Sequence, residues 1–110
     1  MKRCKVYECK RRALGMSQTD VAKLAGVSAP TVSTFERDGE VSALVANAII
    51  RAIDDKLKSL ERKDYMEVML MMSAIQLPEL EDGDEKLRCL TYISLYANKL
   101  QLEILNEQRN

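Results

Sequence analysis

Residues 16–36 read MSQTDVAKLAGVSAPTVSTFE and predict two short helices joined by a tight turn. Ser17 and Ser28 each stand where a helix would begin, and a serine hydroxyl at that place accepts a hydrogen bond from a free backbone amide of the first turn. Gly26 can end the first helix in a left-handed conformation. Pro30 falls in the first turn of the second helix, where its missing amide proton would have no helical partner. The stretch therefore predicts a helix, a glycine-containing turn and a second short helix.

Helices are expected outward from this stretch along the whole chain. Four glycines and two prolines in 110 residues leave little room for strands joined by turns. The expected helices span about residues 2–14, 17–26, 29–37, 41–60, 64–77 and 84–108. The expected buried face of the second helix consists of Val21, Ala22, Leu24 and Ala25. The fourth has apolar residues at 41, 44, 45, 48, 49, 52, 53, 57 and 60. Such steps of three and four are typical of an amphipathic helix, so we expect an all-α fold.

Composition places the chain among folded globular proteins. Hydrophobic residues make up 46% and charged residues 31%, which lies outside the range of disordered chains. The length allows one small domain with a helical extension. The longest apolar-rich stretch, residues 66–77, is too short to cross a bilayer, and charged residues follow the start where a signal peptide needs apolar ones. We therefore expect a cytoplasmic protein that does not enter a membrane.

The chain offers little material for catalysis or metal binding. It contains no histidine, which removes the commonest general base and a common zinc ligand. Cys4, Cys9 and Cys89 do not have the spacing of a zinc site. We expect three reduced thiols that partly serve as small core residues. The sequence accordingly predicts no enzyme, no catalytic residue, no metal site and no cofactor.

Charge is distributed unevenly, although the formal net charge is zero. Residues 1–63 contain 13 Lys and Arg against 8 Asp and Glu, a net charge of +5. Residues 64–110 contain 4 against 9, a net charge of −5. A basic half joined to an acidic half indicates that the first half meets a polyanion and the second does not.

The quoted stretch also resembles a known family. Its residues closely resemble the Cro/CI-like phage repressors, also called XRE-type domains, and the resemblance extends over about residues 5–57. It implies a five-helix, phage-repressor-like helix-turn-helix domain at residues 1–63. Residues 64–110 lie outside the resemblance, and we expect them to form a helical dimerisation or partner-binding extension. The resemblance implies, further, a sequence-specific DNA-binding transcriptional regulator, a repressor encoded by a bacterium or a phage. Glu36 and Arg11 match an acidic and a basic residue that pair in the family, with a structural role.

The resemblance also implies which residues contact double-stranded DNA. The family places a Gln at the start of the second helix against the DNA backbone, and Gln18 stands at that position. Its base-reading and phosphate-contacting positions lie in the third helix and just after it. Carried over to this sequence, the DNA-binding set is Gln18, Ser28, Ala29, Pro30, Thr31, Ser33, Thr34 and Arg37.

Several of these positions depart from the family pattern. Ala29 and Pro30 cannot form a bidentate hydrogen bond; either they pack on thymine methyl groups, or they only begin the helix while the neighbouring hydroxyls and Gln18 read the bases. Arg37 and Ser42 match a phosphate-contacting loop, but acidic residues 38 and 40 beside them oppose such contacts. A basic cluster can either grip the DNA backbone or form a solvated helix face. The cluster consists of Lys2, Arg3, Lys5, Lys10, Arg11 and Arg12.

The C-terminal half resembles no family and carries much apolar surface. The segment at 64–77 is apolar on nearly every side, so we expect it to be covered on more than one face. In the last helix, residues at heptad-like spacing predict a homodimer seam. The seam consists of Leu90, Ile93, Ala97, Leu100 and Ile104. A second interpretation is a protein-interaction module, such as an antitoxin, whose Met-rich residues 64–110 bind another protein.

Overall fold

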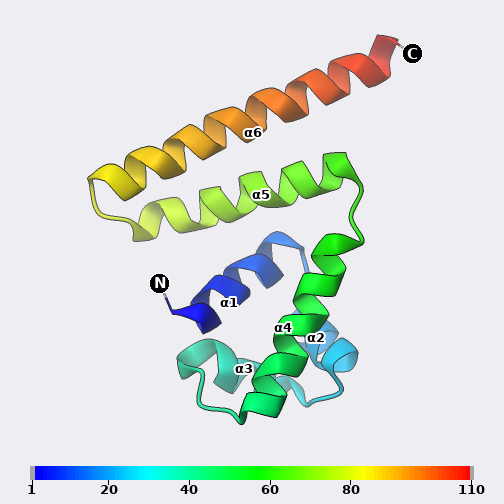
Figure 1. The fold of residues 1–110 in the computed structure, drawn as a ribbon, viewed down its shortest axis with the longest axis vertical. Helices are drawn as coiled ribbons and strands as arrows, with labels where there is room; N and C mark the ends of the chain where they lie inside the picture. Colours follow the sequence, from blue (N-terminus) through cyan, green and yellow to red (C-terminus); the bar gives the residue numbers. More distant parts are fainter. Residues whose placement is uncertain (1, 110) are drawn as a thin grey trace. The chain divides into compact units, whose positions relative to one another are not determined.

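The computed structural model describes residues 2–109, and every regular element in that range is helical (Figure 1). The elements are α1 (Arg3–Ala13), α2 (Gln18–Ala25), α3 (Ala29–Asp38), α4 (Ala43–Lys58), α5 (Arg62–Gln76), the 3-10 helix η1 (Leu77–Glu79) and α6 (Asp84–Arg109). The all-α class expected from the sequence is confirmed. The chain forms two compact units, Met1–Ser59 and Leu60–Asn110. No helix within the described range is both long enough and apolar enough to span a membrane.

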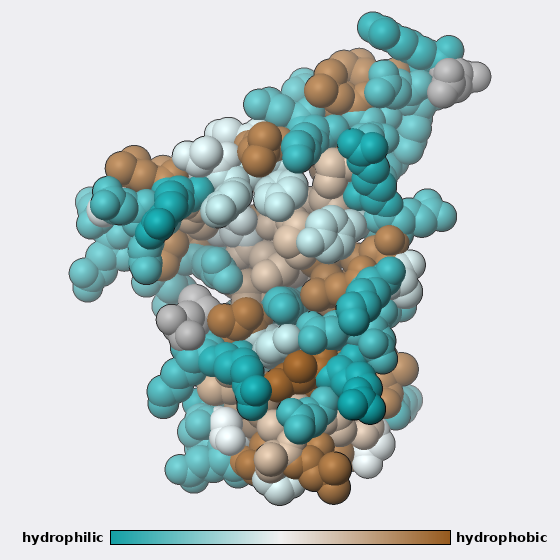
Figure 2. Space-filling view, in the orientation of Figure 1, coloured by the Kyte–Doolittle hydropathy of each residue, from teal (hydrophilic) through white to brown (hydrophobic). Residues whose placement is uncertain are grey.

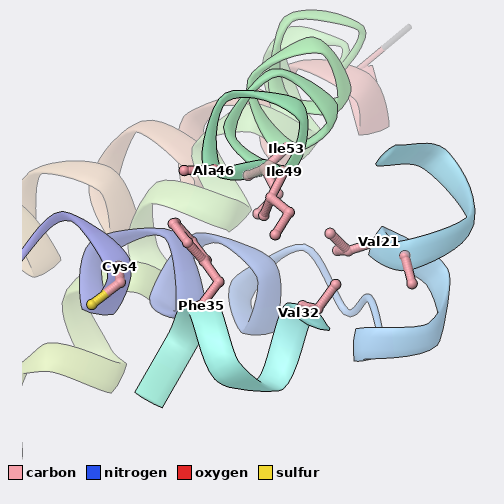
Figure 3. Packing of buried hydrophobic residues seen from close by; sticks show 8 residues of the cluster. Cys4, Val21, Val32, Phe35, Ala46, Ile49 and Ile53 are labelled. Atoms are coloured by element: carbon pink, nitrogen blue, oxygen red, sulfur yellow. The ribbon is translucent and has the colours of Figure 1, made fainter. Parts of the chain in front are cut away.

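An apolar core joins the four helices of the first unit. Its most deeply buried side chains come from α2, α3 and α4, and Figure 3 shows them converging on the space between these helices. They are Val21, Val32, Phe35, Ile49 and Ile53. Burial of a side chain of this size stabilises the fold by about 1.5–3 kcal/mol. The core therefore holds α2 and α3 in a fixed arrangement.

Polar contacts add a second link between α1 and α4. The Tyr7 hydroxyl donates a hydrogen bond of 2.9 Å to Oδ2 of Asp54. The ammonium group of Lys10 lies 3.7 Å from the same carboxylate and 4.3 Å from the centre of the Tyr7 ring. Burial and the hydrogen bond to Asp54 raise the pKa of Tyr7 above its ordinary value of 10.0, so the phenol remains a donor at neutral pH. These contacts attach α1 to α4.

Two predicted core positions of the first unit are wrong. The side chain of Leu24 is 59% exposed, and that of Leu44 is 82% exposed. Leu44 lies two residues, about 200° of helical rotation, before the buried Ala46, so it points to the opposite side of α4. In α2, Leu24 lies next to the buried face that contains Val21 and not on it. Helix α4 begins at Ala43, not at residue 41, because the Ser42 hydroxyl accepts a hydrogen bond from the Val45 amide.

The second unit is a hairpin in which α5 and α6 run antiparallel, side by side (Figure 1). The Cys89 thiol contacts the carbonyl oxygen of Ser73 at 3.1 Å. Near the open end of the hairpin, Arg62 pairs with Glu103 and Lys63 with Glu107, at 3.3 and 3.1 Å. The buried side chains in the described part of this unit are Met66, Val68 and Cys89.

The hairpin changes two expectations about the C-terminal half. The helix-turn-helix unit has four helices within residues 2–59, not five, because α5 pairs with α6. Helix α5 is covered less completely than its composition predicts, since Tyr65 is 43% and Met71 is 48% exposed. Along the predicted dimer seam, Ile93, Ala97 and Leu100 are half-buried within the chain, whereas Leu90 and Ile104 are exposed.

Candidate nucleic-acid interface

Helix α2 begins with the cap that the sequence predicts. The Asp20 amide donates to Oγ of Ser17 at 3.0 Å, and the Ser17 amide donates to Oδ2 of Asp20 at 2.9 Å. This reciprocal pair satisfies two backbone donors that the first turn leaves without helical partners. The hydrogen bonds from Ser17, the backbone one first, lower the pKa of the Asp20 carboxyl below 3.8. The N-terminal end of α2, and with it Gln18, is therefore fixed in position.

Helix α3 begins with the second predicted cap after a left-handed glycine. Gly26 adopts φ +71°, a conformation that costs glycine little and other residues more. The Thr31 amide donates to Oγ of Ser28 at 3.2 Å, and the two hydroxyl oxygens lie 2.7 Å apart. Pro30 occupies the first turn as expected. The two helices are thus joined by a short turn whose exit direction is set by one glycine and one serine.

The DNA-binding residues predicted from the sequence divide into two groups by exposure. The exposed ones are Ser28, Pro30, Ser33 and Arg37. The half-buried ones are Gln18, Ala29, Thr31 and Thr34. Ala29 packs against the core of the first unit, which favours a role in the helix start for this residue. The Thr34 hydroxyl donates to the Pro30 carbonyl oxygen at 3.0 Å, so its oxygen retains only its capacity to accept.

A buried carboxylate links three helices below this surface. Glu36 is 3% exposed, and its carboxylate accepts two hydrogen bonds from Arg11, at 2.6 Å from Nε and 3.0 Å from Nη2. Arg11 also donates to the carbonyl oxygen of Met16 at 2.9 Å. The pairing of Arg11 and Glu36 that the family resemblance implies is confirmed. It is the fork-on-carboxylate geometry in which a guanidinium binds most strongly.

Gln18 belongs to the same network, which the sequence did not indicate. Its amide nitrogen donates to Oε1 of Glu36 at 3.0 Å. A primary amide carries two N–H donors and one acceptor oxygen, so this bond orients the group and leaves further capacity for another partner. Glu36 thereby acts as a fixed support for the Gln18 side chain. The two residues are 18 positions apart, so no local sequence pattern indicates this contact.

Acidic neighbours offset the positive charge of Arg37 at the end of α3. Arg37 Nε lies 3.0 Å from Oδ2 of Asp38, and the arginine side chain is 69% exposed. Oδ1 of Asp38 accepts a hydrogen bond of 2.9 Å from the Glu40 amide. This backbone hydrogen bond, followed by the one from Arg37, lowers the pKa of Asp38, so its negative charge persists at neutral pH. A phosphate would have to compete with this carboxylate for Arg37.

The basic cluster of α1 is partly neutralised within the chain. Lys5 pairs with Glu8 at 3.4 Å, Lys10 pairs with Asp54, and Arg11 is engaged by Glu36. Lys2, Arg3 and Arg12 have exposed side chains. The cluster therefore carries less unpaired positive charge than its sequence indicates. Its exposed members are the ones available to a polyanion.

Comparison with known proteins identifies one part of the chain. A family model described as helix-turn-helix matches residues 10–54, the segment that contains α2, α3 and the Arg11–Glu36 pair. The curated proteins give no match to the chain, and neither do the solved structures. The sequence motif, the caps, the glycine turn and the family model agree. The chain therefore contains, at residues 10–54, a helix-turn-helix domain of the XRE, Cro/CI-like type, the kind found in DNA-binding transcription regulators.

Proposed function

We propose that this protein is a repressor that binds an inverted-repeat operator as a homodimer. The observation that carries the proposal is the exposed N-terminal part of α3, which is held on a rigid core within a helix-turn-helix domain. In such domains the second helix enters the major groove and presents its first residues to base edges. The serine caps of α2 and α3 and the packing of both helices on the core support this proposal.

The side chains on α3 favour recognition of DNA by apolar contacts and single hydrogen bonds. Pro30 offers an apolar surface that suits a thymine methyl group, and the exposed Ser33 hydroxyl can donate to or accept from a base edge or a phosphate. Gln18, supported by Glu36, stands at the N-terminal end of α2, where the partial positive charge of the helix favours a phosphate. None of these contacts is a bidentate arginine or amide pair from α3. Each half-site would therefore be read with modest discrimination.

Modest discrimination makes pairing of two subunits important. A single helix-turn-helix contacts only a few base pairs, and a dimer with two-fold symmetry reads two half-sites about 34–36 Å apart. Residues 60–109 are the natural source of the pairing surface, because their exposed side chains include several large apolar ones. Repression is proposed because the family resemblance is to phage repressors, and a bound dimer would occlude the DNA that it covers.

Selection of bound duplexes from a random pool tests this proposal. The full chain should enrich an inverted repeat whose half-sites are about 10–10.5 base pairs apart, centre to centre. Enrichment of a direct repeat or of a single half-site would contradict the dimer. No enrichment at all would contradict sequence-specific DNA binding. It would favour the alternative that the Met-rich α5, with Tyr65 and Met71 exposed, binds another protein, as in an antitoxin.

A further inference from the structure

Helix α6 has a second apolar face, on the side opposite to α5. The contacts of Cys89, Glu103 and Glu107 fix the side that faces α5. Residues about half a turn away form what we call the outer face. It consists of Leu87, Thr91, Leu95, Asn98, Leu102 and Leu105, all of them exposed. The four leucines are 62%, 43%, 60% and 46% exposed, and Figure 2 shows apolar side chains at the surface over α6.

We propose that the outer face of α6 pairs with the same face of a second copy of this chain. This inference rests on the proposed function, and it names the surface by which the homodimer forms. It differs from the seam predicted from the sequence, whose residues Ile93, Ala97 and Leu100 are half-buried within the chain.

The spacing of the outer face is that of a two-stranded coiled coil. From Thr91 to Leu105 its members follow one another at steps of four, three, four and three. This alternation is the a and d pattern that keeps a seam facing a partner helix. Leu95 and Leu102 occupy one position of the heptad, and Asn98 lies at the other, near the middle of the face.

The polar members of the outer face are compatible with burial. The Thr91 hydroxyl already donates to the Leu87 carbonyl oxygen at 2.9 Å, so covering it leaves no donor without a partner. The amide of Asn98 can both donate and accept, and two such amides pair across a two-fold axis. A single buried polar residue of this kind is a recognised means of fixing the register of a coiled coil.

Charge favours a second copy over a charged partner. The residues of the outer face carry no charge, although residues 60–110 carry ten Asp and Glu against six Lys and Arg. Two copies can thus meet along this face without bringing like charges into the seam. A strongly basic partner would instead be attracted to the acidic sides of the hairpin.

The hairpin also needs the additional burial that pairing provides. Its described residues include three buried side chains, Met66, Val68 and Cys89, which is a small core for about 50 residues. Two paired α6 helices would complete a four-helix arrangement with apolar residues on both sides of α6. A second copy is the occupant that a symmetric operator already requires.

The test compares the same substitution at two positions, one in the outer face and one in the seam predicted from the sequence. Leu102→Glu places a carboxylate in the outer face, whereas Leu90→Glu places one in the seam predicted from the sequence. Both side chains are exposed, at 60% and 43%, so neither change removes a core residue. Mass in solution is measured by sedimentation equilibrium for the full chain, without DNA, at micromolar concentration. Circular dichroism shows whether each variant folds.

We expect wild type and Leu90→Glu to be dimers. For Leu102→Glu, the dissociation constant of the dimer should be at least tenfold higher than for wild type. A monomeric wild-type chain, or a monomeric Leu90→Glu beside a dimeric Leu102→Glu, would overturn the inference. Oxidation of Asn98→Cys should give a covalent dimer, and Lys99→Cys, one residue outside the face, should not. A monomeric chain that still selects a DNA sequence would refute this surface while leaving DNA binding intact.

Discussion

Replacement of Glu36 by alanine tests the buried network beneath the helix-turn-helix surface. The substitution removes three hydrogen bonds to the carboxylate, two from Arg11 and one from Gln18. Arg11 would remain with only 12% of its side chain exposed and with its hydrogen bond to the Met16 carbonyl oxygen. Leaving one member of a buried ion pair uncompensated costs about 3–5 kcal/mol. Because Arg11 keeps one hydrogen bond, we expect the lower end of that range.

Urea unfolding followed by circular dichroism measures this loss. With an m-value of about 1–3 kcal/mol per molar for a small protein, the unfolding midpoint should fall by about 1–3 M. Glu8→Ala is the matched control, because it breaks the exposed pair with Lys5 and should cost about 0–1 kcal/mol. The double variant Arg11→Met/Glu36→Leu should recover part of the stability by removing both charges. Equal midpoints for Glu36→Ala and Glu8→Ala would show that the Arg11–Glu36 pair stabilises the fold no more than an exposed pair does.

Three further predictions concern charge and DNA contact. Because hydrogen bonding lowers the pKa of Asp20, its ionised form stabilises the fold above pH 3.8 and this contribution disappears as the pH falls through the lowered pKa. The difference in thermal midpoint between wild type and Asp20→Asn should therefore narrow below pH 3.8, and a constant difference would contradict the cap. Asp38→Asn should free Arg37 and strengthen binding to duplex DNA in anisotropy titrations at low salt; unchanged affinity would show that Arg37 does not reach the phosphates. Ser33→Ala should weaken binding to the selected operator by about 0.5–1.5 kcal/mol, the value of a single hydrogen bond, and leave binding to random DNA unaffected, whereas an equal loss on both would exclude a base contact.

Local signals in the sequence were sufficient for the helix-turn-helix domain. Ser17, Ser28 and Gly26 act through neighbours at most four residues away, so their roles as caps and turn can be recognised before any tertiary contact is known. The Arg11–Glu36 pair joins distant residues, and it was expected only because the family resemblance implied it. The contact of Gln18 with Glu36 depends on how α2 and α3 pack together, which the pattern of residue types does not encode.

Helical periodicity alone was less successful where a helix has more than one apolar side. Leu44 and Leu24 fit a pattern of three and four, but the core selects only one face of each helix, and both fall outside it. In α6 the same ambiguity is larger, because leucines occur on several sides of the helix. Only the contacts with α5 show which side is covered within the chain and which side remains exposed.

Contact of α3 and the start of α2 with DNA can be followed residue by residue in an NMR titration. The selected duplex is added to the full, isotope-labelled chain, and amide shifts are followed residue by residue. We expect the largest changes at Gln18 and across residues 28–34, with the outer face of α6 unaffected. Changes concentrated in residues 84–109, with no change in α3, would show that the helix-turn-helix does not contact the DNA.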